Sequence, residues 1–293
     1  MEPGDVGQDR ARTGSVVAIG NFDGVHKGHQ LLISRAVSDA RARGLRSVVL
    51  TFDRHPATVV RPGRAPKLLT GVEHKLELLR STGVDEVAVL RFDERRAAEG
   101  AEDFVRDVLV GRLDARTVVV GTNFRFGHHQ HGDVALLESM GRVLGFDVDC
   151  VDLVTDEVGE SASIVSSSLV RSLVSTGELQ LAEVLLGRPF EVRAPLGELR
   201  AADSSTVFHL LVPPGLLVPP PGDYEGVAVR AAEGAEGLVP VRLSVDGGDL
   251  VEISVLLAGA EVPVWLAALR PGDVLAVRFG SAPTGRSAPA AST

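Results

Sequence analysis

The sequence predicts an α/β fold in two parts, a parallel-sheet domain followed by a small antiparallel β-barrel-like domain. In the first part, short β-branched runs alternate with longer segments of helical period, which is typical of strand-helix units that feed a parallel sheet. After Gly187-Arg188-Pro189 the helical period disappears. Val-rich alternating runs separated by Pro/Gly turns take over, and they indicate a small antiparallel barrel or sandwich.

The elements follow in order. Short apolar runs suited to burial on both faces of a sheet predict strands at 16–20, 47–52, 86–92, 117–124 and 147–154. Helices are expected near 27–43, 72–81, 101–110 and 133–144, and two more, at 167–175 and 178–186, end at the stops Gly177 and Gly187. The second part is expected to contain strands at 206–212, 225–230, 239–245, 249–257 and 273–279. We therefore predict a disordered N-terminus (1–14), domains at 15–186 and 187–280, and a disordered tail (281–293).

Composition limits the possible partners and compartment. The chain has 293 residues, 44% of them hydrophobic and 24% charged, which is enough for two globular cores. A formal net charge of −9 and a pI near 5.4 argue against a general binder of nucleic acid or anionic membranes. With Cys150 as its single cysteine, the chain can form no intramolecular disulfide and no multi-cysteine metal cage. Since the N-terminus is polar and no stretch of sequence reaches the length of a membrane span, we expect a soluble cytoplasmic protein.

A candidate phosphate-binding turn follows the first expected strand. It reads GNFDGVHKGH over 20–29 and runs into an amphipathic segment. The unpaired amides and positive dipole end of a helix N-terminus attract phosphate oxygens. His26 and His29 can share one face of the first helical turn, where imidazoles can stabilise charge on an attacked phosphate, and Gly28 allows an anion to approach closely. We predict catalytic roles for the two histidines and phosphate contacts for Gly20, Asn21, Phe22, Asp23, Gly24 and Gly28.

Two other interpretations of the histidine pair are open. An isolated HxxH pair more often decorates a helix cap, and the phosphate interpretation depends on the strand before it, the helix after it and the glycines around it. A zinc site would require a third nearby ligand or the glutamate of an HExxH motif, which this segment lacks. We therefore expect no metal held by protein ligands.

GNFDGVHKGH resembles the HxGH signature of the nucleotidylyltransferase superfamily, whose fold is a Rossmann-like parallel sheet. Its flanking residues are similar to the N-terminal domain of bacterial bifunctional riboflavin kinase/FMN adenylyltransferases. The HxGH element alone leaves the substrate open.

The second expected strand ends in TFDRHP over 51–56, at the carboxyl edge of the sheet, where such folds bind ligands. The family has a similar Thr-Phe-x-x-His-Pro, commonly with proline where this chain has Arg54. The resemblance implies flavin contacts for His55 and Pro56. A histidine before a proline can also be an ordinary extended loop residue.

The fourth expected strand runs into VGTNFRFG over 120–127, which is similar to a family segment that lies around the nucleotide and the flavin. Asn123 is a candidate to bond a ribose or a phosphate. Phe124 and Phe126 offer apolar area suited to a flat ring or to the core, and we expect at least one of them to be core. Three histidines follow that look like a metal tract in isolation but are expected to face solvent: His128, His129 and His131.

A third similar segment, VSSSLVR over 165–171, resembles the Ile-Ser-Ser-Thr-x-Ile-Arg segment that closes the superfamily's site. Serines at a helix start can cap the backbone or bond phosphate oxygens, so both roles are open for Ser166, Ser167 and Ser168. Arg171, one turn into the helix, is expected to hold the outer phosphates of ATP as a catalytic residue.

The resemblance covers roughly residues 15–190 in the family's order. It implies that the FMN phosphate attacks the α-phosphorus of ATP to give FAD and pyrophosphate, with Mg²⁺ bridging phosphates rather than lying in a protein cage. ATP and FMN are thus the expected small-molecule partners, and neither nucleic acid nor a membrane is expected.

The second domain lacks the motif with which this family phosphorylates riboflavin. The family has Gly-Phe-Pro-Thr-Ala-Asn near the start of its C-terminal barrel, whereas this chain reads FEVRAPLGELRAADSSTVFHLLVPPG over 190–215. Glu252 lies in an expected strand where a family glutamate acts as base, but a base has nothing to activate without the metal-binding pair. We therefore expect that riboflavin kinase activity is lost.

Three hypotheses remain open at the level of the sequence: an FMN adenylyltransferase, a related transferase for another phosphorylated acceptor, and a non-catalytic flavin or nucleotide sensor. The intact set of His26, His29, Ser166 and Arg171 favours catalysis, because mere binding would tolerate the loss of contacts to a transition state.

Overall fold

The computed structural model describes residues 13–158, 161–197, 200–202, 205–229, 238–246, 252–257 and 263–280. Contacts divide the chain into two units. Unit 1 comprises Met1–Phe22, Gly28–Ala65 and Leu76–Leu153, and unit 2 comprises Asp23–Lys27, Pro66–Lys75 and Val154–Thr293. The predicted disordered ends lie outside the described residues, except for Thr13 and Gly14.

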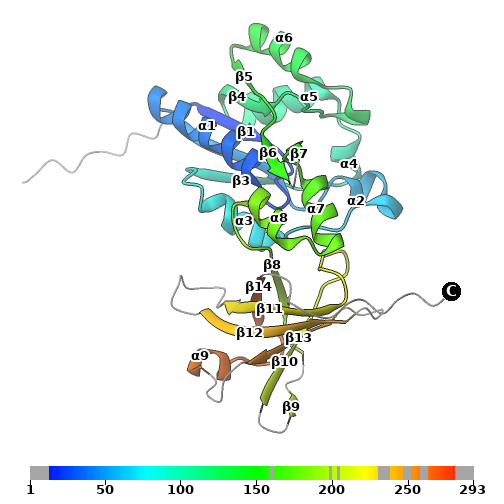
Figure 1. Cartoon of the computed structure of the whole chain (residues 1–293). Helices are drawn as coiled ribbons and strands as arrows, with labels where there is room; N and C mark the ends of the chain where they lie inside the picture. Colours follow the sequence, from blue (N-terminus) through cyan, green and yellow to red (C-terminus); the bar gives the residue numbers. More distant parts are fainter. Residues whose placement is uncertain are drawn as a thin grey trace, which may run out of the picture. The chain divides into compact units, whose positions relative to one another are not determined.

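Unit 1 is built on a parallel sheet, seen in Figure 1. Its strand order is β3-β2-β1-β4-β5. Every neighbouring pair in it is parallel. The central strand β1 is buried at all of its positions, as a sheet covered on both faces requires. The Rossmann-like parallel sheet that the sequence predicts is confirmed. Its strands are β1 (Ser15–Ile19), β2 (Arg46–Phe52), β3 (Glu86–Leu90), β4 (Ala115–Gly121) and β5 (Asp147–Val151).

The longer helices of unit 1 form where the sequence has helical period. Helix α1 (Lys27–Arg43) buries residues spaced three and four apart, among them Ile33, Ala36 and Ala40. Helix α6 (Val134–Leu144) has Asp133 as its N-cap, whose carboxylate accepts from the amide of Leu136. The helix expected at 101–110 has one α-helical turn, α5 (Ala101–Phe104), and continues as the π-helix η2 (Val105–Arg112). The shorter helices of this unit are α2 (Ala57–Val60), η1 (Pro62–Arg64), α4 (Glu94–Ala97) and η3 (His128–Gln130).

Among its described residues, unit 2 contains a seven-stranded antiparallel sheet with the order β8-β14-β11-β12-β13-β10-β9. A bridge between Leu196 and Leu210 brings the end of β8 next to β10. The six strands β8-β14-β11-β12-β13-β10 therefore nearly close into a barrel. The predicted antiparallel β-barrel-like domain is therefore confirmed. The strands are β8 (Glu191–Pro195), β9 (Arg200–Ala202), β10 (Ser205–Leu211), β11 (Gly222–Val229), β12 (Leu238–Val245), β13 (Glu252–Leu257) and β14 (Val274–Phe279).

The remaining elements of unit 2 lie before and beside this sheet. They are α3 (Val72–Arg80, the part up to Lys75), the hairpin β6 (Thr155–Val158) and β7 (Ser161–Ile164), α7 (Ser167–Thr176), α8 (Leu179–Leu186) and α9 (Val264–Ala267). Contacts assign α7 and α8 to the unit that holds the barrel, so the boundary between 186 and 187 stays a prediction. Within the ranges described, no helix has both the length and the apolar character needed to cross a membrane.

Candidate active site

The sheet of unit 1 has a topological switch point at β1. From β1 the chain continues to β2 and β3 on one side, and β4 and β5 follow on the other side. Open α/β sheets bind ligands at the carboxyl ends of the strands beside such a point. Ala18 of β1 pairs with Val119 of β4, so Gly20 and Asn21 leave the sheet at the same edge as Asn123, whose side chain is exposed. Three of the predicted nucleotide-binding residues therefore share the edge where a ligand is expected.

The turn after β1 has an unusual backbone. Phe22, Gly24 and Val25 have φ angles of 53°, 79° and 39°, in the left-handed region. The ring of Phe22 is fully buried and meets the imidazole of His29 edge to face at 5.1 Å between centroids. The buried ring of Phe22 thus packs against His29, in the first turn of α1, and the phosphate contact predicted for Phe22 stays a prediction.

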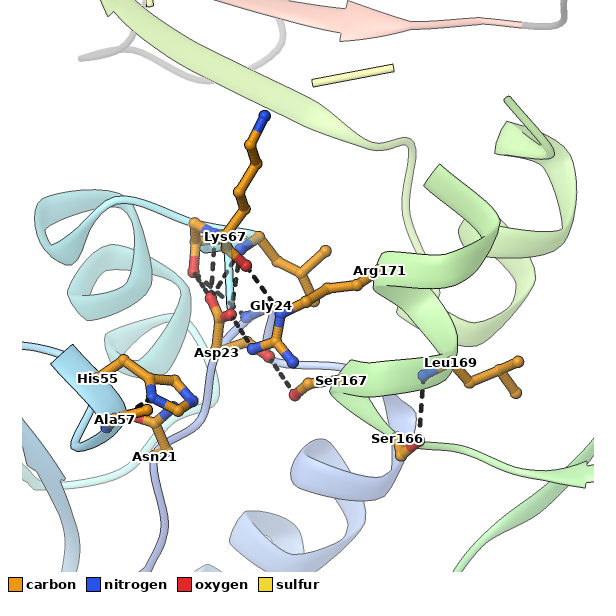
Figure 2. A network of polar contacts seen from close by, with 12 residues as sticks. Asn21, Asp23, Gly24, His55, Ala57, Lys67, Ser166, Ser167, Leu169 and Arg171 are labelled. Atoms are coloured by element: carbon orange, nitrogen blue, oxygen red, sulfur yellow. Dashed lines mark hydrogen bonds and ion pairs between the residues drawn. The ribbon is translucent and has the colours of Figure 1, made fainter. Parts of the chain in front are cut away.

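Asp23 is at the centre of a polar network in unit 2 (Figure 2). Its buried carboxylate accepts from the amides of Leu69 and Thr70 at 3.1 Å and from the Thr70 hydroxyl at 3.2 Å. It also accepts from Nη2 of Arg171 at 2.6 Å, and the side chains of the two residues are only 4% and 15% exposed. Nε of Arg171 donates to the carbonyl of Lys67 at 2.8 Å. Both the carboxylate and two nitrogens of the guanidinium are thus already engaged.

The three serines at the start of α7 have different environments. The hydroxyl of Ser166 accepts from the amide of Leu169 at 3.2 Å, which is the N-cap alternative left open by the sequence. Ser167 donates to the carbonyl of Asp23 at 2.9 Å, and Figure 2 shows this contact. Ser168 is exposed. Two of these hydroxyls therefore bond the protein's own backbone, and their roles toward phosphate stay predictions.

His26 is a neutral imidazole at physiological pH. The side chain is buried, and this burial lowers its pKa from 6.5 to about 4. The nearby Asp23 carboxylate raises the pKa, whereas the charges of Arg188 and Arg171 lower it. A neutral imidazole has one N–H donor and one acceptor nitrogen, so His26 can donate a single hydrogen bond at pH 7.

The loop after β2 positions His55 through its own backbone. Nδ1 of His55 accepts from the amide of Ala57 at 3.1 Å, and Pro56 occupies the N-cap position of α2. Because Nδ1 accepts, the neutral ring carries its proton on Nε2. The predicted flavin contacts of His55 and Pro56 stay predictions.

The two phenylalanines after β4 stack on each other, with centroids 5.4 Å apart and 16° between the rings. Phe126 is buried and also contacts Phe104 at 5.7 Å, so it is the core residue expected of this pair. Phe124 is only partly buried. The three histidines expected to face solvent do so: His128, His129 and His131 are exposed.

Sequence reasoning missed two parts of this site. The segment from Lys67 to Thr70 was assigned no role, yet its amides and a carbonyl bind Asp23 and Arg171. Arg188 was treated only as part of a boundary, yet it donates to the carbonyls of Gly24 and Val25. The sequence offers little indication of either part, because backbone amides and carbonyls are present in nearly every residue type and leave no pattern in the sequence.

Comparisons with known proteins agree with the motifs. Residues 8–168 match the family FAD synthetase. The bifunctional riboflavin kinase/FMN adenylyltransferase of Escherichia coli strain K12 is 40% identical over 179 residues, which cover 61% of this chain and 56% of that protein. The chain thus spans about half the length of this relative. A Geobacillus thermodenitrificans protein, named as a candidate for the same two activities, is 38% identical over 189 residues, which cover 64% of this chain and 98% of that protein.

One solved structure resembles nearly the whole chain. It is titled a macrolide-efflux protein from Streptococcus pneumoniae. The superposition covers 95% of this chain and 88% of the chain of that structure, with a TM-score of 0.76. At 23% identity this likeness supports the fold alone. The family match extends over more than half of the sequence, and the chain therefore belongs to the FAD synthetase family.

Proposed function

We propose that this protein is an FMN adenylyltransferase, which transfers AMP from ATP to FMN and releases pyrophosphate. The observation that carries the proposal is the HxGH turn over 20–29, which follows β1 at the switch point of a parallel sheet and leads into the N-terminus of α1. The names of the relatives, which include FMN adenylyltransferase, favour FMN as the acceptor.

The reaction is a substitution at phosphorus. A phosphate oxygen of FMN attacks the α-phosphorus of ATP in line, the bond from that phosphorus to the bridging oxygen breaks, and pyrophosphate leaves. Negative charge builds up on the oxygens of the attacked phosphate, so donors aimed at them lower the barrier. We assign this role to His26 and His29, which are close in sequence at the start of α1. Because His26 is neutral, it acts as a hydrogen-bond donor rather than as a cation.

The outer phosphates are assigned to the start of α7. Arg171 uses Nε and Nη2 within the protein, so Nη1 is the nitrogen that we expect to meet a phosphate. The roles proposed for Ser166 and Ser167 require that each hydroxyl also contacts phosphate besides its backbone partner. Gly20, Asn21, Gly24 and Gly28 would line the turn, and Asn123 would meet the nucleotide.

Mg²⁺ would arrive on the triphosphate. Mg²⁺ prefers oxygen ligands and retains several waters, and the carboxylate in the turn, that of Asp23, already accepts bonds from Arg171, Leu69 and Thr70. The donors of the turn are therefore imidazoles and amides, which suit phosphate oxygens and leave the ion to be held by the nucleotide. When bound there, the ion neutralises phosphate charge.

On the acceptor side, we assign the flavin to His55, Pro56 and Phe124. Phe124 is half-buried and stacked on Phe126, so it offers a flat apolar face on a rigid support. Phe126 supports that face from the core rather than contacting the ring of the flavin. We also propose that riboflavin kinase activity is lost, because the chain contains no Pro-Thr-Ala-Asn segment.

Incubation with ATP and Mg²⁺ and with either FMN or riboflavin tests the proposal. We expect FAD and pyrophosphate from FMN, and no FMN from riboflavin. His29→Ala should abolish most of the activity, whereas His131→Ala, which removes an exposed histidine, serves as the matched control. Pyrophosphate released only with another phosphorylated acceptor would favour a related transferase. Binding of FMN or ATP without turnover would favour a sensor.

A further inference from the structure

Arg188 contacts the backbone of the HxGH turn from the segment that leads into the barrel. Its Nη2 donates to the carbonyl of Gly24 at 2.6 Å, and its Nη1 donates to the carbonyl of Val25 at 3.1 Å and to that of Leu186 at 3.3 Å. All of these residues belong to unit 2. A guanidinium is a rigid planar fork, so two carbonyls held by its two ends are fixed relative to each other.

The segment that Arg188 holds is strained. Val25 is a buried, β-branched residue with a φ angle of 39°, which is a rare conformation for such a side chain. Such conformations cost energy and are found only where contacts with the surrounding structure hold the residue in place, and they cluster at functional sites. His26 follows Val25 directly, so the direction of the His26 imidazole depends on how this peptide is held.

Other contacts hold the turn at its beginning. The hydroxyl of Ser167 donates to the carbonyl of Asp23 at 2.9 Å, and the amide of Gly24 donates to the hydroxyl of Thr70 at 3.2 Å. The carbonyls of Gly24 and Val25, which precede His26, are held by Arg188. Arg188 therefore acts on the part of the turn closest to the imidazole.

A buried charge on the first strand of the barrel acts on Arg188. Glu191 of β8 is a buried carboxylate that accepts from Nε of Arg193 at 2.7 Å and from Nε of Arg278 at 2.8 Å, and its Oε1 lies 3.4 Å from Nε2 of His74. Burial lowers the pKa of Arg188 to about 10, although the charge of Glu191 raises it. The guanidinium is therefore cationic at physiological pH.

We propose that Arg188 is a positioning residue for adenylyl transfer, which holds the Gly24 and Val25 carbonyls so that the imidazole of His26 stays aimed at the α-phosphate. This inference rests on the function proposed above. It gives Arg188, in the segment that leads into the barrel, a role in adenylyl transfer, even though the chain lacks the family's Pro-Thr-Ala-Asn segment.

Three variants test the inference. Arg188→Met removes the charge and the fork but keeps an apolar stem, and Arg188→Lys keeps the charge. Arg270→Met is the matched control, because Arg270 also donates to two backbone carbonyls, those of Ala268 and Leu269, but outside the turn. We expect Arg188→Met to lower kcat for FAD formation about 100-fold, as for a misplaced catalytic group, with the KM for ATP changed less than about threefold. Arg188→Lys should recover part of this loss, and Arg270→Met should match the wild type.

A second measurement does not depend on FAD formation. Asp23, Arg188 and Arg171 are the charged groups that act on His26, and the charge of Arg188 lowers the pKa of its imidazole. In an NMR titration of the histidines, the pKa of His26 should therefore rise in Arg188→Met and stay low in Arg188→Lys. Amide exchange at Val25 and His26 should become faster in Arg188→Met, because the fork no longer holds their peptides.

The outcomes separate the two proposals. If the wild type makes no FAD, the proposed function fails, and the histidine titration and amide exchange still decide whether Arg188 holds the turn. A folded Arg188→Met with kcat within twofold of the wild type, or with unchanged amide exchange at Val25 and His26, overturns the inference. If Arg188→Met does not fold, kcat and amide exchange are measured on Arg188→Lys instead. Wild-type kcat together with wild-type amide exchange at Val25 and His26 in Arg188→Lys would then overturn the inference that the guanidinium holds the turn.

Discussion

The Asp23→Asn variant tests whether the carboxylate of Asp23 organises the site. Both carboxylate oxygens accept hydrogen bonds in the structure: Oδ1 from the amides of Leu69 and Thr70 and from the Thr70 hydroxyl, and Oδ2 from Leu69 and from Arg171. An asparagine presents an NH₂ group on one side, whichever way its amide is turned. A donor then faces backbone or guanidinium donors in a buried setting.

The expected cost is large for a change of one atom. The two side chains are 4% and 15% exposed, so solvent screens the pair little. Removing one partner of a buried pair leaves an uncompensated charge, here the Arg171 guanidinium, and costs about 3–5 kcal/mol of the free energy of unfolding. The melting temperature should fall on the order of 10 °C.

Trp265, the only tryptophan of the sequence, provides the assay. It packs against the hydrophobic core of unit 2, which also contains Leu69 and Val170, so its fluorescence reports urea unfolding of that core. Asp103→Asn is the control, because Asp103 pairs with Arg106 at 3.9 Å with both side chains more than half exposed. The control should change the free energy of unfolding by less than about 1 kcal/mol. If Asp23→Asn were as mild as this control, the role assigned to the carboxylate would be wrong.

Further predictions concern turnover, protonation and backbone. His29→Ala should lower kcat about 10²–10³-fold and weaken FMN binding far less, and equal loss of both would argue against a charge-stabilising role. Burial lowers the pKa of both His26 and His74 from 6.5 to about 4, so the unfolded chain binds more protons than the folded chain between these pH values. The free energy of unfolding should therefore fall as the pH drops from 6.5 to about 4, by up to about 3 kcal/mol per histidine. NMR titration midpoints near 6.5 for these histidines would contradict this prediction. Gly127→Ala should destabilise by more than about 2 kcal/mol, because φ is +72° and a Cβ would lie 2.7 Å from Cα of Ala101, whereas Gly63→Ala, where a Cβ meets open space, should change urea unfolding by less than about 1 kcal/mol.

The sequence was sufficient to predict the two folds because their patterns are local. Buried parallel strands read as short apolar runs, and the glycines expected to end α7 and α8, Gly177 and Gly187, have left-handed φ angles of 81° and 71°. The hairpin of β6 and β7 was not predicted, because its strands are short and carry charges such as Asp156 and Glu157 instead of an apolar run. The π-helical turns after Phe104 were missed as well, since they keep a helical pattern of apolar residues.

The site was predicted less completely because its contacts join segments far apart in the chain. The carboxylate of Asp23 binds Arg171, 148 positions away, and the amides of Leu69 and Thr70, 46 and 47 positions away. The phosphate contact predicted for Asp23 stays a prediction. Nothing in the residue types near Leu69 signals such amides. The HxGH pattern, by contrast, lies in one continuous turn between a strand and a helix, and for that reason the sequence alone could place it.

The most direct test of the central claim is a crystal structure of the chain with FMN and an ATP analogue that resists cleavage at the α-phosphate. The account predicts the α-phosphate within hydrogen-bond distance of the imidazoles of His26 and His29, with the outer phosphates near Nη1 of Arg171. A nucleotide bound elsewhere, with both imidazoles directed away from its phosphates, would contradict it.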